Sequence, residues 1–194
     1  MTNFPVPPTQ PGALMLAGLA FSLLVLIKRL RTRRATSGVT RDRWSIVGLV
    51  LQGTGIALAA VGGVDTSRAL GDPVAIVGTL MTLSIGLGAT WLFARSAAAL
   101  GANWSLVART SDAHQLIRSG PFARVRHPIY SAIFLFACAV GIGLGHYWQL
   151  LVALPVHLAG TLVRIRIEER LLRARFGAAY DDYVRATPAL IPRF

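Results

Sequence analysis

Charged residues are scarce in this sequence, and acidic residues are the scarcest. Only 14% of the 194 residues are charged, whereas a soluble domain normally has about a quarter. Eight residues are acidic and 20 are basic, which gives a net charge of +12. The single cysteine, Cys138, excludes an intramolecular disulfide and a metal site built on several thiolates, so we expect it to pack as a small apolar residue. Because 54% of the residues are hydrophobic, much of the surface is predicted to face lipid.

Four long segments contain no Asp, Glu, Lys or Arg: residues 11–27, 44–64, 73–94 and 128–163. A bilayer core of about 30 Å requires about 20 apolar residues per helix. The first three segments each fit one span. The fourth is too long for one span and has glycines near its middle, so it is predicted to form a tight helical hairpin. The fold class is therefore an all-α integral membrane protein with about five transmembrane helices, since helices satisfy their own backbone in lipid.

The basic residues lie almost entirely on one side of these predicted spans. They follow the first span, the third span and the fifth span, and only Arg68 is left for the other side. The positive-inside rule then places the N-terminus outside and the C-terminus in the cytoplasm. We also expect an uncleaved first span, because the basic cluster follows the apolar segment instead of preceding it. Nucleic-acid binding is disfavoured, since these residues flank spans and form no single soluble basic face.

Two regions are predicted along the chain. Residues 1–99 form an N-terminal transmembrane scaffold of three spans, in which glycines allow close helix packing. These glycines are Gly48, Gly53, Gly55, Gly62, Gly63, Gly78, Gly86 and Gly88. Residues 100–194 contain a polar connection, the two-span hairpin and a helix over about residues 164–183 that leaves the membrane, with a possible break at Gly177. The oligomeric state is left open.

Two histidines in the hairpin receive structural interpretations. His146 falls in the outer turn, remote from the cytoplasmic side, and is expected to be solvated. His157 lies inside a span two residues after Pro155. An intramembrane ionisable residue favours a functional role, but we expect His157 to bond the carbonyl that the proline leaves without a donor.

Two cytoplasmic patches contain most of the polar chemistry. The first, residues 111–130, offers backbone amides near glycine and proline, aromatic rings and two histidines, which suits a compact polar ligand. The second, residues 164–170, places Arg164 and Glu168 four apart on one helical face. Acidic residues at the end of a membrane helix are costly unless they are paired or functional. Taken alone, Glu168 and Glu169 are interpreted as partners of neighbouring arginines.

The two patches together resemble the isoprenylcysteine carboxyl methyltransferase family. Gly120-Pro121-Phe122 and then Arg126-His127-Pro128-Ile129-Tyr130 resemble its G-x-Y/F and R-H-P-x-Y motifs. The later motif begins with Glu168-Glu169, continues through Phe176-Gly177, Tyr180 and Tyr183, and ends with Leu190-Ile191-Pro192. The resemblance covers about residues 100–194. Ala132 stands where the family often has glycine, a small departure.

The resemblance implies S-adenosylmethionine as the cofactor and a lipophilic acceptor. No metal is expected. The resemblance assigns cofactor contacts to two stretches and several single residues: His114, Gln115, Leu116, Ile117, Gly120, Phe122, His127, Pro128, Ile129, Tyr130, Glu168 and Glu169. Glu168 is the carboxylate expected to hold the cofactor and is one of two catalytic residues, with Arg164. Arg164 is expected to bind the substrate carboxylate through two parallel hydrogen bonds.

The acceptor and the chemistry stay open at this level. An ionised carboxylate needs no general base, so positioning can supply much of the rate enhancement. The leading prediction is carboxyl O-methylation of an isoprenylated cysteine or a related lipid carboxylate. A phospholipid or amine N-methyltransferase would need a base, Glu169 or His127. A membrane reductase and a non-catalytic scaffold are the remaining alternatives, although the sequence lacks a dinucleotide phosphate loop and inverted repeats.

Overall fold

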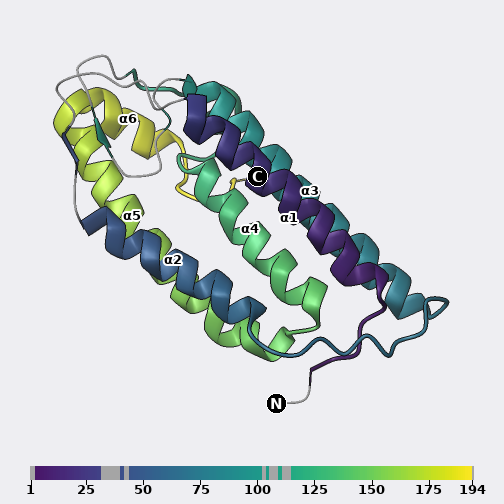
Figure 1. Cartoon of the computed structure of the whole chain (residues 1–194). Coiled ribbons are helices and arrows are strands. Elements are labelled where there is room, and N and C mark those ends of the chain that lie inside the picture. Colours follow the sequence, from purple (N-terminus) through teal and green to yellow (C-terminus); the bar gives the residue numbers. More distant parts are fainter. Residues whose placement is uncertain are drawn as a thin grey trace.

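The computed structural model describes residues 3–31, 40–41, 44–101, 104, 109–110 and 115–193. Within them the regular secondary structure is helical apart from one short antiparallel ladder (Figure 1). The elements are α1 (Thr9–Arg31), β1 (Thr40–Arg41), α2 (Trp44–Ala60), α3 (Pro73–Leu100), β2 (Arg109–Thr110), the 3-10 turn η2 (Gly120–Ala123), α4 (Pro128–Leu144), α5 (Tyr147–Phe176) and α6 (Ala178–Ala186). Strand β1 pairs with β2, Thr40 opposite Thr110 and Arg41 opposite Arg109.

Local sequence explains where the long helices begin and end. The Asp72 side chain caps α3 by accepting from the Val74 backbone N–H at 2.8 Å, and this bond lowers the pKa of the Asp72 carboxyl. Gly145 adopts the left-handed region at φ 72° and ends α4. Helix α5 begins two residues later, so the predicted hairpin is confirmed. The predicted break at Gly177 is confirmed as well, since α5 ends at Phe176 and α6 starts at Ala178.

Four of the five long helices form two packed pairs, and the fifth, α4, contacts both pairs. Helix α2 runs along α5, α1 runs along α3, and α4 contacts all four of these helices (Figure 1). The packing prediction for glycine is confirmed at several positions. A Cβ on Gly55 would overlap His157 of α5, and one on Gly86 would overlap Ala17 of α1. It is wrong for Gly53, Gly63 and Gly88, where no atom of the described part of the chain comes within 4 Å of an added Cβ.

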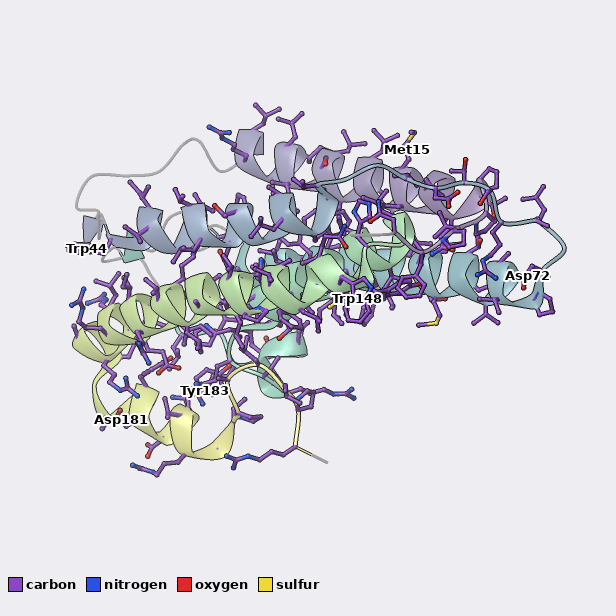
Figure 2. The ribbon with its side chains drawn as sticks, turned by 90° about the horizontal axis from the view of Figure 1, so that it is seen from below. Met15, Trp44, Asp72, Trp148, Asp181 and Tyr183 are labelled. Atoms are coloured by element: carbon purple, nitrogen blue, oxygen red, sulfur yellow. The ribbon has the colours of Figure 1, made fainter. Side chains whose placement is uncertain are left out.

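The apolar outer surface is that of a membrane protein. Helices α1, α3 and α5 are long and apolar enough to span a bilayer. Met15 and Leu19 on α1 are 68% and 65% exposed, and Met15 points away from the bundle in Figure 2. Helices α2 and α4 have 17 residues each, the lower limit of the roughly 17–25 residues that a span uses. All five predicted apolar helices are therefore present, while the number of spans stays a prediction.

Both histidine interpretations need correction. His146 is fully buried, and its ring nitrogens lie 3.1 Å from the carbonyl oxygens of Ala59 and Gly63. The turn folds inward onto the end of α2, so His146 fastens the hairpin and is not solvated. His157 Nδ1 lies 3.0 Å from the Gln52 carbonyl of α2 and not at the carbonyl released by Pro155. Close packing of α2 on α5 explains this choice of partner.

Candidate active site

The end of the bundle where α4 starts contains a dense polar cluster, which we call the carboxylate cluster: Arg126, His127, Tyr130, Glu168 and Glu169. The residues before and in the first turn of α4 are fixed there by the C-terminal segment. The backbone N–H groups of Arg126 and His127 donate to the carbonyls of Pro188 and Ala189 at 2.8 and 2.9 Å. The Ser131 hydroxyl donates to the Leu190 carbonyl at 2.7 Å. The terminal motif therefore packs directly on the R-H-P motif, although about 60 residues separate them.

Glu169 forms the buried half of the carboxylate cluster. It is 9% exposed, and its Oε1 accepts from Arg126 Nη2 at 2.7 Å and lies 3.2 Å from His127 Nε2. Arg126 also donates to the carbonyls of Val184 and Thr187. One carboxylate thus ties α5 to the residues preceding α4, and through Arg126 to the last turn of α6 and the residue that follows it. This arrangement is typical of a structural buried ion pair.

Glu168 forms the accessible half of the cluster. Its side chain is 37% exposed, and its Oε2 accepts from the Tyr130 hydroxyl at 2.8 Å. His127 Nδ1 lies 3.8 Å from the same oxygen, and the rings of His127 and Tyr130 stack at 5.7 Å. The Glu168 carboxylate is therefore oriented from α4 and stays partly exposed.

Arg164 lies one turn before Glu168 and is almost completely buried. Its side chain is directed toward α4, where the guanidinium lies 5.2 Å from the centroid of the Tyr130 ring. From α2, the Gln52 Oε1 accepts from Arg164 Nη1 at 3.2 Å. The guanidinium is therefore held between two helices beside the carboxylate cluster, with 4% of the residue exposed.

Phe122 is held at the edge of the cluster by η2. Gly120 takes a left-handed φ of 62° that starts this turn. The Tyr183 hydroxyl of α6 donates to the Phe122 carbonyl at 2.6 Å. Burial raises the pKa of Tyr183 to about 12, so the hydroxyl keeps its proton at neutral pH and remains a donor. Tyr183 and Asp181 mark α6 in Figure 2.

The structure brings together five of the residues predicted from sequence: Arg164, His127, Tyr130, Glu168 and Glu169. Phe122 and Pro128 are buried nearby, whereas Ile129 packs against the apolar cluster around Phe93 and Trp104. In the other stretch Gln115 is exposed and Leu116 and Ile117 are half-buried. His114 lies outside the described residues.

Two participants were missed at the sequence level. Arg126 was given no role beyond its place in the R-H-P motif, yet it forms the shortest ion pair of Glu169, at 2.7 Å. Gln52 lies in an apolar segment of the first half and reaches the site from α2. A polar side chain inside a membrane helix commonly bonds across helices, and that signal would have identified Gln52.

Comparison with known proteins decides the family. The model of the isoprenylcysteine carboxyl methyltransferase (ICMT) family matches residues 81–174, which include the R-H-P motif and both glutamates. The nickel-cobalt-cadmium resistance protein NccN of Alcaligenes xylosoxydans xylosoxydans is 33% identical over 163 residues, 81% of this chain and 68% of that protein. The chain belongs to the ICMT family. The family resemblance predicted from the motifs is confirmed.

Two relatives of this ICMT-family chain are named as methyltransferases. Protein-S-isoprenylcysteine O-methyltransferase of Schizosaccharomyces pombe is 29% identical over 121 residues, 60% of this chain. The aligned part spans about half of that enzyme, 51% of its length. Methanethiol S-methyltransferase 2 of Bradyrhizobium diazoefficiens is 44% identical over 70 residues, 36% of this chain and 26% of that enzyme.

Proposed function

We propose that this protein is a membrane methyltransferase that uses S-adenosylmethionine and methylates a lipophilic acceptor carrying a carboxylate. The observation that supports this most is that a partly exposed carboxylate, Glu168, lies one helical turn from a buried guanidinium, Arg164. The Glu168 carboxylate can accept hydrogen bonds from the ammonium group in the amino acid part of S-adenosylmethionine. The Arg164 guanidinium can bind an anion. Both residues belong to a chain that has two relatives named as methyltransferases.

The residues present fit such a cofactor chemically. Its amino and ribose hydroxyl groups require acceptors. The Glu168 carboxylate, whose Oε2 accepts from Tyr130 and whose side chain is 37% exposed, is proposed to accept from them through Oε1. Its carboxylate requires donors, and the backbone of the exposed Gly120, at the start of the turn that contains Phe122, is proposed to supply them. The rings of Phe122 and Tyr130, which are 7% and 5% exposed, are proposed to line the apolar part of the site. The stretch 114–117 and residues 127–130 are the proposed remaining contacts.

The chain's own residues perform positioning. Tyr130 orients Glu168 by donating to Oε2. Glu169 fixes the His127 ring, whose Nε2 lies 3.2 Å from Glu169 Oε1. Arg164 is proposed to hold the acceptor carboxylate by two parallel hydrogen bonds. When bound, S-adenosylmethionine would supply a sulfonium methyl group that a carboxylate oxygen accepts, with the electron pair of the broken C–S bond remaining on sulfur. An ionised carboxylate releases no proton in this transfer, so these residues need only orient the reactants and exclude water.

Arg164 also favours one class of acceptor over another. A buried guanidinium beside the reaction site attracts a carboxylate and repels an ammonium headgroup. This argues for an isoprenylated cysteine or a related lipid carboxylate and against a phospholipid amine. The similarity to a methanethiol S-methyltransferase makes a thiol the acceptor to test beside the carboxylate.

The first experiment is calorimetric binding of S-adenosylmethionine and S-adenosylhomocysteine to the detergent-purified chain. Glu168→Gln should abolish binding without unfolding the protein, and Asp182→Asn, an exposed acid on α6, should bind as wild type. Transfer of a radiolabelled methyl group is then measured to N-acetyl-S-farnesylcysteine, to an alkanethiol and to phosphatidylethanolamine. Absence of binding to well-folded wild-type protein would refute the proposed function.

A further inference from the structure

From helix α2, the side-chain amide of Gln52 reaches the candidate active site. This residue is 2% exposed, and its backbone carbonyl and both polar atoms of its side chain have a partner on α5. Its Oε1 accepts from Arg164 Nη1 at 3.2 Å, and its Nε2 donates to the Thr161 hydroxyl at 2.8 Å. Its carbonyl lies 3.0 Å from His157 Nδ1. Because a guanidinium only donates, the amide can take only the orientation with Oε1 toward Arg164.

The same helix also leaves space for the arginine stem. One turn before Gln52 stands Gly48, where a Cβ would overlap Arg164 Cγ and would lie 2.8 Å from the Gly160 carbonyl. Gly160 in turn faces the α2 backbone at Gly48 and Gln52. The two helices therefore approach closely at Gly48 and Gly160. The stem of the Arg164 side chain crosses α2 at Gly48, and its guanidinium donates to the Gln52 amide.

We infer that Gln52 is a positioning residue for Arg164 and thereby sets the affinity for the acceptor carboxylate. The guanidinium is held from the α2 side by Gln52 and from the α4 side by the Tyr130 ring at 5.2 Å. A fixed guanidinium loses less conformational freedom when it binds a carboxylate than a mobile one does. This inference rests on the proposed function, and it gives the N-terminal half of the chain a role in acceptor binding.

A purely structural role is the competing explanation. Gln52 also bonds Thr161, and its backbone bonds His157, so it could act only to fasten α2 to α5. The two roles differ in what they predict. A fastener affects stability and every ligand alike, whereas a positioning residue affects the acceptor and leaves the methyl donor unchanged.

The test uses the full-length chain in lipid nanodiscs with N-acetyl-S-farnesylcysteine as the acceptor probe. Gln52→Met, which keeps the volume and removes the hydrogen bonds, should raise the acceptor KM about tenfold while the Kd of S-adenosylmethionine stays within about twofold. Thr161→Val, which removes one anchor of the amide, should raise the KM by a smaller factor. Gln10→Met is the matched control, because Gln10 is also 2% exposed but donates to Ile142 near the other end of α4.

A double-mutant cycle decides whether Gln52 acts through Arg164. In the Arg164→Met background, Gln52→Met should leave the acceptor KM unchanged. An acceptor KM that rises equally in Gln10→Met, or effects of Gln52 and Arg164 that add, would overturn the inference. If the wild-type chain transfers no methyl group, the proposed function fails. The same cycle on thermal unfolding then tests the contact alone, and additive shifts in melting temperature would overturn it.

Discussion

The Tyr130 hydroxyl donates to Glu168 Oε2 at 2.8 Å and joins the first turn of α4 to α5. The bond links two sequence motifs that lie 38 residues apart. It orients the accessible glutamate of the pair and leaves the other, Glu169, to the buried interactions with Arg126 and His127. The adjacent glutamates therefore have different surroundings and different expected roles.

Removing the Tyr130 hydroxyl tests the first of these roles. Tyr130→Phe deletes a hydrogen bond to a charged group, which typically contributes about 1.5–3 kcal/mol. We expect a modest fall in melting temperature in detergent and weaker binding of S-adenosylmethionine, both measured on the same preparation. Wild-type affinity in this variant would show that Glu168 needs no orientation by Tyr130.

Glu169→Ala should destabilise the protein more than Glu168→Ala does. Loss of Glu169 leaves Arg126 without its carboxylate at a site where both side chains are about 10% exposed, a change that typically costs about 3–5 kcal/mol. Glu168 is more exposed, so its loss should spare the fold and affect ligand binding. Thermal unfolding and calorimetry distinguish the two variants. Equal melting temperatures would contradict this division of roles.

The close approach of α2 and α5 can be tested with a pair of glycines on one helix. Gly48→Ala places a Cβ against the Arg164 stem and the Gly160 carbonyl, and such overpacking typically costs about 1–3 kcal/mol. Gly53→Ala meets nothing within 4 Å and should be neutral or stabilising by about 0.5–1 kcal/mol. Denaturation curves measured in the same detergent provide the comparison, and matching curves would refute the tight interface.

His146→Ala should loosen the end of the bundle opposite the carboxylate cluster. The variant removes a fully buried ring whose two nitrogens lie 3.1 Å from the carbonyl oxygens of Ala59 and Gly63, and we expect a loss of about 2 kcal/mol. Binding of S-adenosylmethionine to the folded fraction should not change, since the cluster lies at the other end of α4. Hydrogen exchange in residues 57–66 should increase. Unchanged exchange there would argue against this fastening role.

The predicted orientation can be measured by labelling single cysteines from one side. In a Cys138→Ala background, Thr66→Cys and Ala186→Cys provide two exposed positions, one before α3 and one at the end of α6. An N-terminus outside and a C-terminus in the cytoplasm predict that an impermeant maleimide labels Thr66→Cys in intact cells. Ala186→Cys should react only after the membrane is opened. The reverse pattern would invert the proposed topology.

Much of the helical architecture could be predicted from the sequence because it depends on local chemistry. Long apolar segments must form helices in lipid. Gly145 and Gly177 adopt positive φ angles, which end α4 and α5. The expectation for His146 failed because exposure depends on whether a turn folds back over the bundle. The partner of His157 was wrong for a similar reason, since it is decided by which helix packs beside α5.

The sequence by itself determined the membrane character, the order of the apolar helices and the family, because composition, segment length and short motifs are local properties. Only the tertiary structure decided which glutamate is buried, and that Arg126 is its partner. It also decided that Gln52 of α2 meets Arg164 of α5. Residues about 40 to 110 positions apart meet through helix packing, whose close contacts depend on small residues such as Gly48 and Gly160 at the points where two helices meet.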